Sequence, residues 1–153
     1  MKHLLSAILF VALSYPTRLR VSGSRLFARC HNLQSVVIPN SVTSIKWSTF
    51  SSCTNLQSVV IPNSVTSIGT FAFNGCANLQ NVVIPNSVTT IGAKAFYGCK
   101  NLQSISMSES VANIDSFAFL QCTNLSKIEV SPNNRRYSSK DGALYSKSGD
   151  TLF

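Results

Sequence analysis

The sequence predicts a solenoid, in which short repeats of one length stack along a single axis. Two observations predict it. The cysteines recur at equal intervals of 23 residues, at Cys30, Cys53, Cys76, Cys99 and Cys122. The stretches between them are near copies of one another, each with Asn-Leu-Gln close to its start and Phe-x-x-Cys at its end. A fixed period of about 20 to 50 residues is typical of stacked arrays and outweighs other fold assignments.

Inside each copy the apolar positions predict one short β-strand. They follow the spacing i, i+3, i+5, which is not a helical stripe. The three columns begin at Leu33, Val36 and Ile38 and recur with the period of the repeat. Because every copy runs in the same direction, successive strands are expected to pair in parallel. Pro39 and its equivalents are expected to end the strand, since proline has no N–H to donate.

The second half of each copy predicts a return path. A Val-Thr-x-Ile segment is expected to be extended, with Val and Ile pointing inward. Gly69 and Gly92 follow it and are expected to form a bend with positive φ. The phenylalanines before each cysteine are expected to form an aromatic ladder, at Phe50, Phe73, Phe96 and Phe119. The cysteines are expected to form a ladder of small buried thiols, although the strand spacing would also permit disulfides between neighbours.

The consensus L-x-x-V-x-I-P-x-S-V-T-x-I-G-x-x-A-F-x-x-C resembles the BspA-like leucine-rich repeat, the class with 23-residue units. The resemblance covers residues 31–145. It implies a leucine-rich-repeat solenoid that is mainly β. The expected form is a right-handed coil with a parallel β-sheet face, short turns or helical turns on the other side, and a C-terminal β-hairpin cap.

The N-terminal residues fit two interpretations that stay open. Residues 1–14 combine Lys2, a short apolar run and the small residues Ala12 and Ser14, which is typical of a secretory signal. The repeat frame also continues upstream, with Pro16 and Phe27 in the columns of Pro39 and Phe50. Residues 1–14 are therefore a candidate signal peptide, and residues 15–30 are a degenerate first repeat or N-terminal cap.

Residues 31–122 form four regular repeats, and the pattern decays after Cys122. Residues 123–153 retain one strand and then predict a hairpin-like cap. We expect the hairpin to pair residues 143–146 with 151–153 through a Lys-Ser-Gly-Asp turn. The chain stops at Phe153, within an apparent strand. We interpret that as a truncated sequence, because a strand that ends on an exposed Phe is a liability.

The charge pattern argues against nucleic acid as a partner. The chain carries a formal net charge of +8, but only 12% of its residues are charged. Most basic residues flank the regular repeats and form no compact patch in the sequence. Nucleic-acid binding needs clustered cations, usually with a recognisable module. The net positive charge still predicts a weak, salt-sensitive attraction to anionic surfaces.

The sequence predicts no enzyme, no metal site and no cofactor. His31 occupies a column otherwise held by Thr, Ala and Lys, and the carboxylates lie far along the stack from it. No phosphate-binding glycine loop or nucleotide motif is present. The cysteine spacing does not suit zinc, which favours close Cys-x-x-Cys pairs. No stretch is long and apolar enough to span a bilayer.

Two surfaces are candidates for binding. The first is the strand face, with candidate residues Gln34, Val37, Gln57, Val60, Gln80, Val83 and Gln103. The alternative is that these ladders only record recent duplication. The second is a set of aromatic residues in variable columns, Trp47, Phe71, Tyr97 and Phe117. Exposed aromatics are common binding anchors, but these residues could instead pack on neighbouring repeats.

The family resemblance also implies a function. It implies a secreted or cell-surface, non-catalytic module for protein interaction or adhesion, whose ligand is a protein or glycan on a host or neighbouring cell. The alternative is a structural fragment of a larger surface array, with no binding role of its own. A repeat scaffold does not fix its ligand, so the sequence leaves the partner open.

Overall fold

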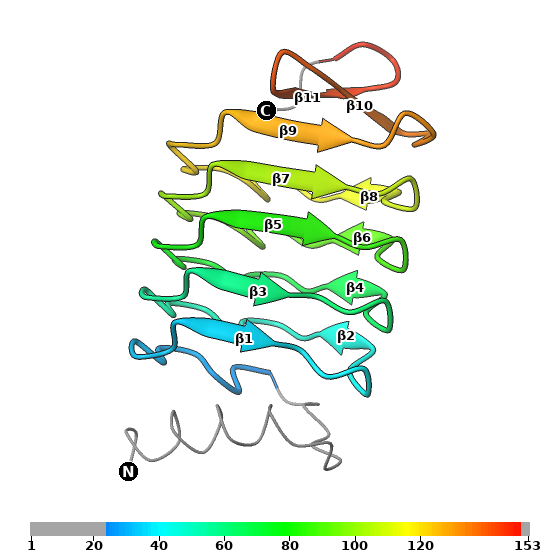
Figure 1. Cartoon of the computed structure of the whole chain (residues 1–153). Coiled ribbons are helices and arrows are strands. Elements are labelled where there is room, and N and C mark those ends of the chain that lie inside the picture. Colours follow the sequence, from blue (N-terminus) through cyan, green and yellow to red (C-terminus); the bar gives the residue numbers. More distant parts are fainter. Residues whose placement is uncertain (1–23, 151–153) are drawn as a thin grey trace.

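The computed structural model describes residues 24–150, which coil into stacked turns around one axis (Figure 1). One wall of the coil is a five-stranded parallel sheet. Its strands, in spatial order, are β1 (Ser35–Val37), β3 (Ser58–Val60), β5 (Asn81–Ile84), β7 (Ser104–Met107) and β9 (Lys127–Val130). Each residue lies opposite its equivalent one repeat later, as Val36 lies opposite Val59. The expected parallel solenoid is confirmed.

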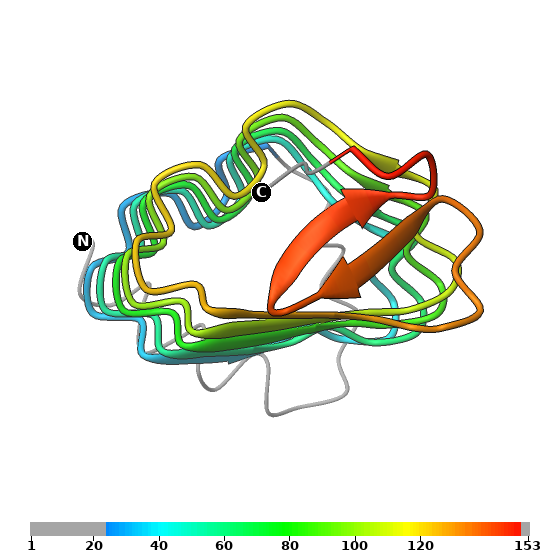
Figure 2. The same ribbon diagram turned by 90° about the horizontal axis from the view of Figure 1, so that it is seen from above.

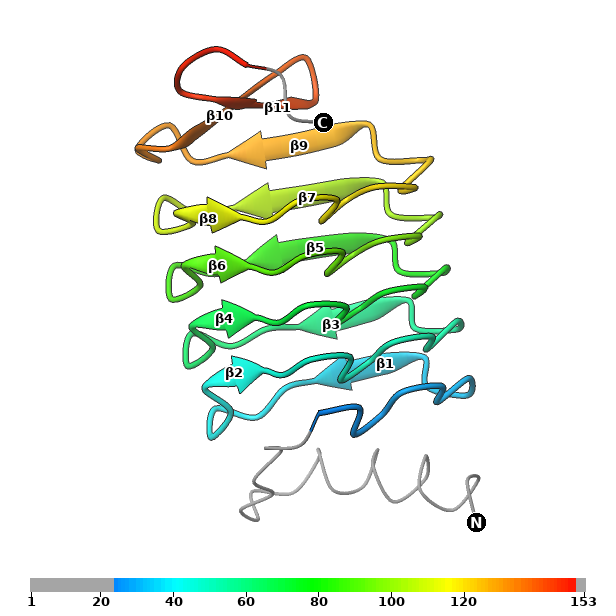
Figure 3. The same cartoon turned by 180° about the vertical axis from the view of Figure 1, so that it is seen from behind.

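A second wall comes from the Val-Thr-x-Ile segments. Its four-stranded parallel sheet consists of β2 (Ser44–Ile45), β4 (Ser67–Ile68), β6 (Thr90–Ile91) and β8 (Asn113–Ile114), which Figure 3 shows from behind. Val65 and Ile68 point inward and are buried, while Thr66 between them is exposed. The described residues contain no helix, so the side that joins this wall back to the first sheet is built of turns.

The interior is a set of columns in which like residues stack on like. The phenylalanine rings have centroids 5.3 Å apart from Phe50 to Phe73 and from Phe73 to Phe96, with interplanar angles of 7°. Phe27 adds one more ring, 5.3 Å from Phe50, and Phe119 lies 5.7 Å from Phe96. Stacked aromatic pairs contribute about 0.5–1.5 kcal/mol each beyond the area they bury. The expected aromatic ladder is present and extends to Phe27.

Gly69 and Gly92 were expected to form bends with positive φ. That prediction was wrong, because neither has a positive φ. A Cβ on Gly69 would lie 2.8 Å from the backbone oxygen of Ile45, and one on Gly92 would lie 2.7 Å from the backbone nitrogen of Thr70. These distances are shorter than real Cβ contacts, so the glycines allow close approach of two turns. The positive-φ bends lie further along, at Phe71 (58°) and Gly75 (70°) and at their equivalents.

The cysteines form no disulfide with one another, and they make up the expected ladder of thiols. Each of the last four donates its S–H to a phenylalanine carbonyl of the preceding turn; Cys76 Sγ, for example, lies 3.2 Å from Phe50 O. Burial raises the pKa of the Cys53 thiol from 9.0 to about 12, and burial also raises the pKa of Cys76. A thiol that stays protonated is a poor nucleophile, so these two cysteines act as packing groups.

The C-terminal cap is a hairpin, as expected, and residues 143–146 form one of its strands as predicted, but the partner strand precedes them in the chain. β10 (Tyr137–Lys140) pairs antiparallel with β11 (Ala143–Ser146). Asp141 and Gly142 join them with φ values of 52° and 80°, as a tight two-residue hairpin turn requires. The Lys-Ser-Gly-Asp segment follows β11, and its predicted partner, residues 151–153, lies outside the described residues. So do residues 1–14 and their predicted signal.

Two side chains replace contacts that a further repeat would make, Asn134 in the loop before the hairpin and Tyr137 at the start of β10. Asn134 is 2% exposed, and its Nδ2 donates to Ser108 O at 3.0 Å and to Val111 O at 2.9 Å. The hydroxyl of Tyr137 accepts the backbone N–H of Ile114, at the outer edge of β8, at 3.0 Å. An unpaired strand edge invites association with other chains, and these contacts close part of it.

Candidate interaction surfaces

The strand face presents an uncharged, regular surface over the first four strands. Its valines point outward, with exposed fractions of 56% for Val37, 55% for Val60 and 68% for Val83. The four glutamines at the start of the strands are also exposed, and Gln57 N–H donates to Gln34 O at 2.8 Å in the ladder. All the predicted strand-face residues therefore lie along one exposed face of the five-stranded sheet, whose strands Figure 1 shows side by side.

Polar side chains on this face bond to one another along the stack. Ser104 Oγ donates to Asn81 Oδ1 at 2.6 Å. At the end of the sheet, Lys127 Nζ pairs with Glu129 at 2.9 Å, and Ser106 Oγ donates to the same carboxylate at 3.3 Å. The lysine bond lowers the pKa of Glu129. Charge thus enters this face only at β9, and the surface over β1 to β7 is apolar and neutral-polar.

The turn side gathers aromatic residues around a lysine. Lys94 Nζ lies 5.5 Å from the ring centroid of Tyr97, 5.8 Å from that of Phe71 and 5.9 Å from that of Phe117. These distances fall within the range of cation–π attraction. Three of the four predicted aromatic residues are therefore brought together around Lys94, and each of them remains partly exposed.

Trp47 belongs to a separate contact one turn from the N-terminal end. The guanidinium of Arg25 lies 4.3 Å from the centroid of the Trp47 ring. Sequence reasoning named the aromatic residues but missed both cations. For Lys94 the signal was available, because Lys94 occupies the same repeat column as Phe71 and Phe117 and lies one repeat from each, so stacking had to bring it beside those rings.

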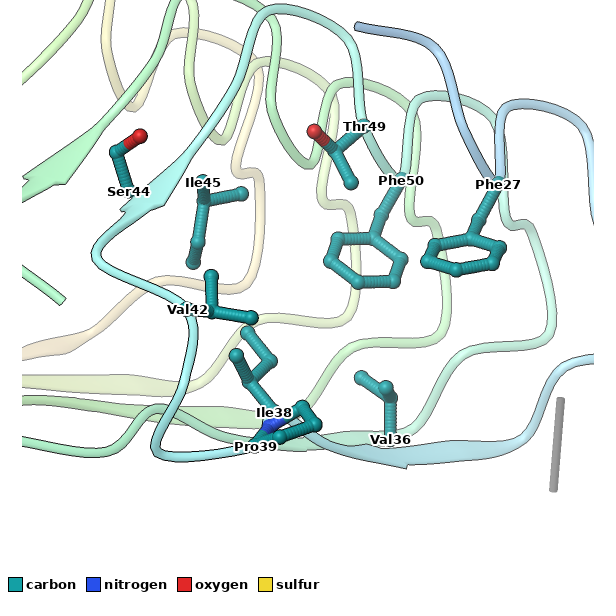
Figure 4. Close-up of a pocket in the computed structure, with 9 residues that line it drawn as sticks. All are labelled: Phe27, Val36, Ile38, Pro39, Val42, Ser44, Ile45, Thr49 and Phe50. Atoms are coloured by element: carbon teal, nitrogen blue, oxygen red, sulfur yellow. The ribbon is translucent and has the colours of Figure 1, made fainter. Parts of the chain in front are cut away.

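A small gap between the sheets at the first described turns is not a ligand site. Figure 4 shows its lining side chains pointing toward one another, among them Phe27, Val36, Ile45 and Phe50. The gap has a volume of about 10 Å³. That is about the space one water molecule occupies, and the lining is apolar. We regard it as ordinary core packing.

The opposite end of the coil carries the hairpin, which crosses it when the molecule is seen along the axis in Figure 2. Beside the hairpin turn lies an open hollow of about 620 Å³, lined by residues that include Leu120, Cys122, Leu125 and Asp141. Its mixed lining shows no convergent set of polar groups.

The described residues offer no group of three or more His, Cys, Asp or Glu that could hold a metal ion. Among residues 24–150 no helix has the length and apolar character needed to cross a membrane.

The sequence pattern of the BspA type leucine rich repeat region matches residues 12–144 in six copies. A comparison with curated proteins gives no match.

Solved structures of bacterial repeat proteins resemble this one. A leucine rich cell surface protein of Faecalibacterium prausnitzii is 37% identical, with a TM-score of 0.69 over 71% of this chain and 28% of its own. A leucine rich repeat protein of T. pallidum is 32% identical, with a TM-score of 0.67 over 69% of this chain and 49% of its own. The pneumococcal vaccine antigen PcpA is 23% identical and shares the fold, with a TM-score of 0.57 over 74% of this chain and 34% of its own. The chain thus spans half or less of the length of each.

Proposed function

The chain belongs to the BspA-type leucine-rich repeat family, and from that premise we propose that it is a non-catalytic interaction module of a secreted or cell-surface protein. The F. prausnitzii protein it resembles is described as a cell surface protein, which supports this location. The described residues bring together no catalytic or metal-binding constellation that would support an enzyme instead.

The observation that carries the proposal is the strand face over β1 to β7. Val37, Val60 and Val83 are each more than half exposed, in a straight row on a rigid parallel sheet. When a ligand covers apolar side chains in such a row, the binding free energy becomes more favourable by about 25 cal/mol for each Å² of apolar surface buried. The glutamines beside them supply both donors and acceptors, so one ligand can satisfy apolar and polar contacts together.

The size and charge of the face limit the partner. Five strands about 4.8 Å apart span only about 20 Å along the stack. A face of that width is smaller than the area that each partner buries in a standard protein–protein interface. The face therefore fits a segment of a protein or a glycan better than a whole folded domain. Because the surface over β1 to β7 carries no charge, its affinity is expected to change little with salt.

The test is capture of extracellular matrix proteins and immobilised cell-surface glycans by the purified chain. The variant Val60→Lys/Val83→Lys places two charges in the centre of the strand face. The variant Thr66→Lys/Thr89→Lys adds the same charge at exposed positions of the second sheet and serves as the matched control. We expect the first variant to lose binding by about tenfold or more, since each buried lysine must be desolvated, and the control to bind normally.

Equal capture by both variants would contradict the role of the strand face. Absence of capture by the unmodified chain would favour the alternative, in which these repeats are a spacer within a longer surface array. The near identity of the strand-face ladders from one repeat to the next favours that alternative, because it shows no position adapted to a particular ligand.

A further inference from the structure

Charge is divided unevenly along the stack. All five acidic residues of the chain lie between residues 109 and 150. Residues 24–108 contain five cations and no acid. Those five cations are Arg25, Arg29, Lys46, Lys94 and Lys100, and each lies in the turn segment that joins the second sheet back to the first. The strand face of the same repeats carries none, so the positive charge is confined to the turn side.

The turn side also exposes large apolar side chains. Leu26 is 47% exposed, Trp47 39%, Phe117 52% and Leu120 44%. Apart from the three strand-face valines, these are the exposed large hydrophobic residues of the described chain. We call the following residues the turn-face patch: Arg25, Trp47, Phe71, Lys94, Tyr97, Phe117 and Leu120.

The cations of the turn-face patch contact rings and not carboxylates. Arg25 lies over Trp47, and Lys94 lies among Phe71, Tyr97 and Phe117. The ion pair of the described residues joins Lys127 to Glu129, on the strand face. Asp115 is the carboxylate of the described turn segments, and its Oδ1 accepts the backbone N–H of Ser116 at 2.7 Å. Among the described residues, Arg25 and Lys94 form no ion pair, and the turn segments carry more cations than carboxylates.

We propose that the turn-face patch binds the surface of a membrane rich in anionic phospholipids. Cations beside exposed Trp, Phe and Leu are the combination that lies in the interface between headgroups and acyl chains. Arg25 and Lys94 are three repeats apart, or about 14 Å along the stack. That spacing suits a surface with many anionic headgroups better than one discrete anionic group. This inference concerns a different face from the proposed strand-face site and does not depend on it.

The exposed apolar residues of the patch favour a membrane surface over other polyanions as its ligand. Acidic glycans and nucleic acids offer charge but little to cover Phe117 or Leu120, whereas the outer part of the acyl layer covers both. Trp47 is the single tryptophan of the chain and lies in the patch, so its fluorescence reports on this face alone. That provides a direct measurement of contact.

The experiment titrates the full chain with vesicles of phosphatidylcholine alone and with vesicles that also contain phosphatidylglycerol. We expect a blue shift of Trp47 emission and co-sedimentation with the anionic vesicles only. Binding is expected to weaken strongly at about 1 M salt, where the screening length is about 3 Å. Heparin and single-stranded DNA, each added in place of vesicles, test the other polyanions.

Two double variants locate the contact. Arg25→Gln/Lys94→Gln keeps long side chains but removes two charges from the patch, and we expect its partition to fall about twentyfold or more. Arg135→Gln/Lys140→Gln removes two exposed charges from the cap region and should change partition less than threefold. Phe117→Ser should also weaken binding, while Val83→Ser on the strand face should not. Circular dichroism of each variant confirms that it folds.

Four results would overturn the proposal. They are an unshifted Trp47 emission with anionic vesicles, equal binding to neutral vesicles, an equal loss with the cap-region variant, and a Trp47 shift with heparin or DNA but not with vesicles.

Discussion

In the central turns, each group that faces the next repeat meets its own counterpart there. Phe73 stacks on Phe96 with an interplanar angle of 7°, and Asn101 Nδ2 donates to Asn78 Oδ1 at 2.9 Å. At the C-terminal end the same kinds of groups meet unlike partners. Ile128 N–H donates to Gly142 O at 3.0 Å, and Val130 N–H donates to Ser139 Oγ at 3.1 Å.

The difference shows how a repeat array ends. Within the array, each interface is a copy of the next, so stability is close to a sum of equal terms. The end has no further copy, so a few individual side chains must satisfy the outward-facing groups. Asn134 does so by donating to Val111 O, in the segment before β8, and Tyr137 does so by accepting the N–H of Ile114 in β8. A substitution in a central turn should therefore disrupt the stacking between the two halves of the array, whereas a substitution at the end should unfold only the last turn.

The largest expected effect tests the central ladder. Phe73→Ala removes a fully buried ring that stacks on both neighbours, and we expect it to lower the free energy of unfolding by about 3–5 kcal/mol. Phe27→Ala removes a ring with one described stacking partner and should cost about half as much. Urea unfolding followed by circular dichroism measures both. Equal losses would contradict the idea that a central interface contributes more than the outermost described one.

The second prediction tests the C-terminal end. Asn134→Ala loses the bonds to Ser108 O and Val111 O and the acceptor that Arg136 N–H and Tyr137 N–H use at 2.8 Å. We expect a loss of about 2–4 kcal/mol in the free energy of unfolding. Exposed Asn133→Ala is the control and should change stability by less than about 0.5 kcal/mol. Hydrogen exchange should locate the added opening in residues 104–150, and uniform opening of every turn would argue against a local cap.

The smallest effect concerns the thiols. The pKa of Cys53 is 9.0 ordinarily and about 12 in the fold, so the folded protein holds this proton more tightly. The stability from this group is complete below about pH 9 and falls as the pH rises toward 12, by about 1.4 kcal/mol per pH unit. Urea unfolding at about pH 8 and about pH 10 measures the change. In Cys53→Ala the free energy of unfolding should fall less between these two pH values. A decrease equal to that of the unmodified chain would contradict the assignment of this pKa shift to Cys53.

The period of the sequence determined the register of the whole array. Because each turn has the same length and must bury the same apolar columns, Phe50 could only lie beneath Phe73, and Val36 only beside Val59. The parallel sheet, the inward Val and Ile residues and the exposed strand-face valines all follow from that one constraint. Local chemistry also indicated that a hairpin follows the last strand.

Tertiary structure alone decided how the turns approach one another. Gly69 and Gly92 are required by the backbone of the preceding turn, which no single copy of the repeat reveals. The hairpin turn was expected at Lys-Ser-Gly-Asp, whereas the structure places it at Asp141 and Gly142. Gly142 lies against the backbone of Ser126 and its carbonyl accepts Ile128 N–H, so this turn is fixed by its contact with β9 and the residue before it. The placement of Lys94 among three rings likewise depends on neighbouring turns, because contacts between turns are absent from any one repeat.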